Sequence, residues 1–226
     1  MSVGSAAVGS VTWFGLREPF SGLSHLWGVF LSIAGLVLLE CLSRGEPWRA
    51  TSFAIYGASS IILYGCSAVY HLLPAPPHVI DNLRKLDHIG IFFLIAGCYT
   101  PVCLVKMQDG WGWSIFGIVW GIAIGGTCAE LLWARMPEWF RFVLYILMGW
   151  MALIGIGHVA HAIGPVGLGW LIGGGVLYSI GAACYATERP RLWPGIFGAH
   201  DVWHCFVLAG SAAHFMLMMT FARPAA

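Results

Sequence analysis

Two histidines near the end of the sequence, His200 and His204, lie four residues apart. On a helix this spacing puts both side chains on one face about a turn apart, which suits two ligands of one metal ion. His71 supplies a third imidazole, and three imidazoles with one open position make a zinc site of the catalytic type. Asp87 can then act as a general base or orient a water, and Ser67 can bind a water or support the site. Because imidazoles plus water suit zinc, the expected cofactor is Zn²⁺.

A His-x-x-x-His pair is a weak signal on its own, because many helices carry plain surface or core histidines. Inside a membrane the balance changes, since ionisable groups there are costly and mark functional sites. The alternative is a hydrogen-bonded polar cluster that only ties helices together.

The composition places these residues in a membrane. Of the 226 residues, 59% are hydrophobic and only 9% are charged, whereas a soluble domain carries about 25% charged residues. A soluble globule, a disordered chain and a nucleic-acid binder are therefore disfavoured, and no nucleic-acid partner is expected. The class that remains is a polytopic membrane protein.

Seven stretches are long and apolar enough for membrane helices, which need about 20 residues each. They predict an all-α, seven-transmembrane helix bundle; their unbroken apolar runs do not fit a barrel, whose strands alternate. The expected organisation is a short cytoplasmic N-terminal segment (1–22), the membrane domain (23–222) and a tail (223–226). Gly164-Pro165 is expected to separate spans five and six. The expected spans are 23–42, 53–72, 88–105, 111–133, 139–156, 166–186 and 202–221.

The basic residues predict the orientation, because cytoplasmic loops carry an excess of Lys and Arg. With a cytoplasmic N-terminus, seven basic residues fall on the inner side and four on the outer side. This favours an N-terminus inside and a C-terminus outside. The inner set is Arg17, Arg84, Lys85, Arg135, Arg141, Arg189 and Arg191, and the outer set is Arg44, Arg49, Lys106 and Arg223.

The order of the spans brings the chemical residues together. In a seven-span chain, odd spans begin on the face where even spans end. His71 ends the second span, Asp87 opens the third, and His200 and His204 open the seventh. All of them therefore gather on one side, which is the cytoplasmic side in the expected orientation.

Other polar residues are assigned more modest roles. Glu18 and His25 open the first span, and they either cap or orient the site or pair with each other. Glu130 is expected to snorkel to the interface. His158 and His161 are expected at the end of span five, on the opposite face from the cluster, as interfacial histidines.

The same residues carry a resemblance to the hemolysin III family. Glu18-Pro-Phe-Ser-Gly-Leu-Ser-His25 resembles its opening motif, and Ser67-Ala-Val-Tyr-His71 resembles its Ser-x-x-x-His signature. Residues 86–101 and 198–215 are similar to its third-span and last-span blocks. The family contains bacterial relatives of the progestin and adiponectin (PAQR) receptors and resembles alkaline ceramidases in a wider superfamily. This chain departs from the pattern at Ser21, where Asn is expected, at Asp201, where Glu is usual, and at Cys98, where Thr is usual.

The resemblance implies seven helices, an inner N-terminus and a zinc near the cytoplasmic leaflet of the cell's inner (plasma) membrane. It carries zinc ligation to His71, His200 and His204, a water-binding role to Asp87 and a supporting role to Ser67. None of the departures removes a ligand.

Three functions compete at this point. The first is a zinc-dependent hydrolase of a lipid amide or ester, with membrane lipids and a lipid-like substrate as partners. The second is a receptor or membrane-state sensor with structural zinc and a lipid-like ligand. The third is a pore, which ranks lowest because a pore needs rings of polar residues through the full thickness of the membrane. The sequence does not identify a protein partner.

Overall fold

The computed structural model describes residues 15–133, 136–193 and 196–222. Residues 1–14 of the expected N-terminal segment, the tail 223–226, and the basic residues Arg135 and Arg223 lie outside the described residues. Within them the protein is all-α, as predicted, with no β-strand. The elements are α1 (Pro19–Leu42), α2 (Pro47–Leu72), α3 (Pro77–Pro101) with a π-helical turn (Val102–Lys106), α4 (Gly110–Leu132), α5 (Glu138–Gly149) with a 3₁₀ turn (Met151–Leu153), α6 (Ile156–Thr187) and α7 (Ala199–Met219).

Six of these helices, all except α5, are long and apolar enough to cross a membrane. The chain is therefore a multi-pass membrane protein by its helix composition. Large apolar side chains point outward, as expected for a surface in contact with lipid: Trp27 is 66% exposed and Leu132 is 87% exposed. The side of the membrane on which each end lies remains a prediction.

The expected fifth span, 139–156, is wrong as one continuous helix. Helix α5 has 12 residues, or about 18 Å at 1.5 Å per residue, which is short of the roughly 30 Å hydrocarbon core. The backbone groups at its end find a partner in α3 instead of continuing the helix. The Tyr99 hydroxyl donates to the Gly149 carbonyl at 2.9 Å and accepts from the Ala152 amide at 3.0 Å.

The expected break at Gly164-Pro165 is a kink within α6. Gly164 has φ 69° and ψ 176°, a backbone region that glycine reaches without strain and other residues avoid. Pro165 has no N–H to continue the hydrogen-bond ladder. As a result His158 and His161 lie in the first part of α6 and not at the end of the preceding helix.

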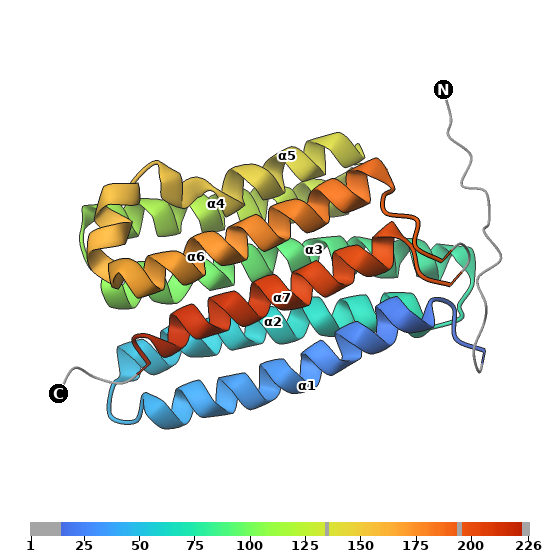
Figure 1. The fold of residues 1–226 in the computed structure, drawn as a ribbon. Coiled ribbons are helices and arrows are strands. Elements are labelled where there is room, and N and C mark those ends of the chain that lie inside the picture. The colour runs from blue at the N-terminus through green and yellow to red at the C-terminus, as the bar shows by residue number, and fades with distance from the viewer. Residues whose placement is uncertain (1–14, 134–135, 194–195, 223–226) are drawn as a thin grey trace.

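Successive helices, α5 included, run antiparallel, so the start of α1, the end of α2 and the starts of α3 and α7 lie together (Figure 1). We call this the site end of the bundle. Helix α1 packs on α2 and α7, and α3 lies between α2 and α4. Helix α3 is the most buried, with 72% of its apolar stretch inside the protein against 17% for α1. It passes close to α2 because Gly97 has no side chain: a Cβ there would lie 2.6 Å from the Ser59 side chain.

Candidate metal centre

Three histidines converge at the site end. His71 lies in the last turn of α2, and His200 and His204 project from the first two turns of α7. The Nε2 atom of His200 is 3.4 Å from Nε2 of His71 and 3.0 Å from Nε2 of His204. One ligand atom from each residue lies within 4.8 Å of the others. The structure therefore brings together the three residues that were predicted from the sequence to be metal ligands.

The spacing of these nitrogens fits a metal ion. Zinc binds imidazole nitrogen at about 2.0–2.1 Å in a tetrahedral arrangement, so two ligand nitrogens lie about 3.3 Å apart. The two Nε2 separations of 3.4 and 3.0 Å bracket that value. His71 and His204 are only 0% and 2% exposed, so their rings are held within the helices rather than in solvent. The triad can hold a metal ion, and its donor set suits zinc.

The start of α1 contacts both ligand-bearing helices. Glu18, the residue before α1, places its carboxylate 2.5 Å from Nδ1 of His71 and 3.3 Å from Arg17. Burial disfavours the charged carboxylate, but the hydrogen bond to His71 and the charge of Arg17 outweigh it and lower the pKa of Glu18. Glu18 thus pairs with the metal-site histidine and not with His25.

On the α7 side, Ser21 Oγ donates to Asp201 Oδ1 at 2.7 Å. Asp201 Oδ2 in turn accepts from the Gly198 amide at 2.9 Å and caps the helix that carries His200 and His204. Ser21 and Asp201 are two of the departures from the family pattern, and each is smaller than the residue expected there. The two changes meet in one hydrogen bond.

His25 lies inside the cluster without a polar contact. Its ring lies against the His204 ring, tilted by 32° with 3.8 Å between centroids, and meets Tyr64 edge-on at 5.0 Å. Both of its ring nitrogens are buried without a hydrogen-bond partner among the described residues. Its contact with His204 makes it a wall of the site.

Asp87 and Ser67, the expected catalytic pair, line a cavity that also reaches His200 and His204. The Ser67 hydroxyl is buried and has no hydrogen-bond partner in the part of the chain that the structure describes. The catalytic roles of both residues remain predictions.

The cavity continues from the histidines into the bundle, between α3, α5, α6 and α7. It reaches Met107, beyond the far end of α3, and most of its wall is aliphatic or aromatic. Such a space suits a long apolar group whose polar end lies at the histidines. Lining residues along its length include Ile91, Leu94, Tyr145, Leu171, Val207 and Leu217.

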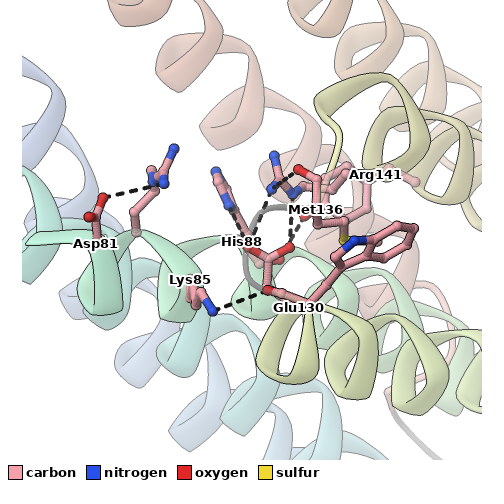
Figure 2. A network of polar contacts seen from close by, with 9 residues as sticks. Asp81, Lys85, His88, Glu130, Met136 and Arg141 are labelled. Carbon is pink, nitrogen blue, oxygen red and sulfur yellow. Dashed lines mark hydrogen bonds and ion pairs between the residues drawn. The ribbon is translucent and has the colours of Figure 1, made fainter. Parts of the chain in front are cut away.

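A buried ionic network lies beside this cavity (Figure 2). Glu130 of α4 is 3% exposed and accepts from Arg141 of α5 at 3.2 and 3.3 Å. His88 of α3 approaches the same carboxylate at 3.3 Å, and Arg141 also donates to the Met136 carbonyl at 3.4 Å. The expectation that Glu130 snorkels to the interface is therefore wrong, because Arg141 neutralises it inside the protein.

A sequence signal for this network existed. Glu130 and Arg141 are opposite charges in neighbouring apolar helices, and such charges usually pair. The identity of the pair depends on how α4 and α5 turn toward each other, which the spacing of the residues does not fix. The Ser21–Asp201 bond was missed for the same reason, since its partners are 180 residues apart.

Comparison with known proteins identifies the family of this chain. The family described as "Haemolysin-III related" matches residues 15–215. "Hemolysin-3" of Bacillus cereus is 33% identical over 218 residues, covering 96% of both chains. "Hemolysin-3 homolog" of Bacillus subtilis (strain 168) is 33% identical over 205 residues, covering 90% of this chain and 93% of that one. "Monocyte to macrophage differentiation factor" of Homo sapiens is 25% identical over 200 residues, covering 85% and 79%. The chain therefore belongs to the hemolysin III (haemolysin-III-related) family of membrane proteins.

Proposed function

We propose that this protein is a zinc-dependent hydrolase that cleaves a lipid amide or ester within the membrane. The observation that carries the proposal is the position of the histidine triad beside a largely apolar cavity, whose wall includes His200 and His204 of the triad together with Asp87 and Ser67. A triad of imidazoles leaves a tetrahedral ion one open position, which is typical of catalytic rather than structural zinc.

Each residue has a defined task in this reaction. His71, His200 and His204 would hold the zinc, which supplies Lewis acidity toward a carbonyl group and makes water more acidic. Hydrolysis adds the hydroxyl of water to the carbonyl carbon and a proton to the leaving amine or alcohol. Asp87 takes that proton from the water and delivers it to the leaving group. Ser67, whose buried hydroxyl has no partner among the described residues, orients the water or Asp87.

The apolar part of the cavity accounts for the substrate class. Its aliphatic and aromatic wall accepts an acyl chain, while Asp87, Ser67, His200 and His204 supply polar groups at the triad. A substrate dissolved in the bilayer reaches such a site without passing through water. The excess of basic residues expected on the inner side supports a site in the cytoplasmic half of the plasma membrane.

The test uses the purified full chain in detergent with one ceramide and one lipid ester as substrates. We expect about one zinc per chain and turnover by the wild type, and a loss of about 10²–10⁴-fold in Asp87→Ala with zinc retained. Asp81→Ala is the matched control, because Asp81 lies on the same helix, 62% exposed and paired with Arg84. Zinc-loaded protein that turns over neither substrate would reject the hydrolase and, if unaltered lipid is recovered bound, favour a receptor or sensor.

A further inference from the structure

The His71 ring is engaged at both of its nitrogens. Its Nε2 faces His200 Nε2 at 3.4 Å, and its Nδ1 lies 2.5 Å from Glu18 Oε2. The ring is fully buried, at 0% exposure. His204, another of the three proposed ligands, differs from His71 because its Nδ1 has no hydrogen-bond partner in the described chain.

The Glu18 carboxylate is itself held in place. The Glu18 amide donates to the His71 carbonyl at 2.9 Å, so both the backbone and the side chain of Glu18 contact His71. Arg17 lies 3.3 Å from the other carboxylate oxygen, Oε1. Arg17 also donates to the Tyr70 carbonyl, and its guanidinium lies 4.4 Å from the centre of the Tyr70 ring. Arg17 and Glu18 therefore dock as a pair onto the last turn of α2.

This contact decides which nitrogen of His71 can bind a metal. A neutral imidazole has one N–H and one lone pair. Because an ionised carboxylate only accepts hydrogen bonds, the hydrogen of His71 resides on Nδ1 and the lone pair on Nε2, which faces the other histidines. A carboxylate behind a ligating histidine also fixes the plane of its ring and makes it a stronger donor to the metal.

We propose that Glu18 is the positioning residue of the metal centre: it selects the tautomer and ring orientation of His71 that bind the ion. This inference rests on the proposed metal site at His71, His200 and His204. It resolves the two roles open to Glu18, because the carboxylate orients the site and does not pair with His25. The segment before α1 is then part of the metal centre although it carries none of the ligands.

The test compares Glu18→Ala and Glu18→Gln with wild type as full-length protein in detergent. Zinc affinity is measured by competition with a chromophoric chelator, and the ligand field by the visible spectrum of the cobalt-loaded protein. We expect zinc binding about 10–100-fold weaker in Glu18→Ala, together with altered cobalt bands. Glu18→Gln keeps an acceptor oxygen but loses the charge, so its affinity falls between the two.

Glu40→Gln is the control, since it makes the same chemical change near the other end of α1. It should bind zinc as wild type does. If the Glu18 carboxylate only holds α1 in place, the Glu18 variants will lower the melting temperature of the metal-free protein and leave its zinc affinity and cobalt spectrum unchanged. That result overturns the proposal. An equal loss of affinity in Glu40→Gln also overturns it.

His71→Ala separates this inference from the proposed site. If His71→Ala loses zinc while both Glu18 variants keep wild-type affinity, the metal site stands and the role of Glu18 is wrong. If His71→Ala also keeps wild-type affinity, the ion does not bind at these histidines, and both proposals fail.

Discussion

The ion pair between Glu130 and Arg141 offers a sharp test of the packing of α3, α4 and α5. Both side chains are buried, at 3% and 6% exposure, and share two contacts of 3.2 and 3.3 Å. Removing one member of a buried pair costs about 3–5 kcal/mol, because the other charge is left without compensation. For a chain of this size each kcal/mol shifts the melting temperature by about 2–4 °C, so a single substitution should lower it by roughly 6–20 °C.

The two single variants should differ. Glu130→Gln leaves the permanently charged Arg141 with only the Met136 carbonyl, at 3.4 Å. Arg141→Met leaves Glu130 beside His88, at 3.3 Å, and a carboxylate can also take up a proton. We therefore expect Glu130→Gln to be the more destabilised. The double variant Glu130→Leu/Arg141→Met, which buries no charge from the pair, should melt close to wild type.

The measurement is thermal unfolding in detergent followed by circular dichroism. The matched control is Arg84→Met, which removes a pair whose side chains are 41% and 62% exposed and should cost less than about 1 kcal/mol. Two results would show that the ion pair is not buried as described. One is a melting temperature of Glu130→Gln equal to that of Arg84→Met. The other is a decrease in the melting temperature of the double variant equal to the sum of the decreases in the two single variants.

Two further predictions concern helix contacts. Ser21→Ala removes a hydrogen bond of 2.7 Å to the Asp201 carboxylate, so the free energy of unfolding should fall by about 1.5–3 kcal/mol; a melting temperature equal to wild type would show that this bond does not join α1 to α7. Gly97→Ala places a Cβ 2.6 Å from Ser59, whereas the same change at Gly117 meets no atom within 4 Å. Gly97→Ala should therefore lower the free energy of unfolding by about 1–3 kcal/mol. Equal melting temperatures of the Gly97→Ala and Gly117→Ala variants would refute the close approach of α2 and α3.

The histidine triad could be predicted because two simple rules suffice. The four-residue spacing of His200 and His204 puts them on one face of α7, and the parity of spans brings the end of α2 to the start of α7. Neither rule needs knowledge of side-chain packing. The structure brings the triad together as these rules require.

The course of the chain between α5 and α6 could not be predicted, because hydropathy measures where a segment is buried and not where its helix stops. Residues 139–156 are largely apolar, yet α5 ends at Gly149, where the Tyr99 hydroxyl bonds to the backbone. The partner of Glu130 was missed for a related reason. Snorkelling and burial beside Arg141 fit the same sequence position, and only the packing of α4 against α5 separates them.

The central claim is that His71, His200 and His204 bind one zinc ion. Elemental analysis of purified wild type beside His71→Ala and His204→Ala tests it most directly, with His161→Ala as a control because His161 lies in the first part of α6, away from the triad. We expect about one zinc per chain in wild type and in the control, and a loss of most of it in each triad variant. Zinc content unchanged in both triad variants would contradict it.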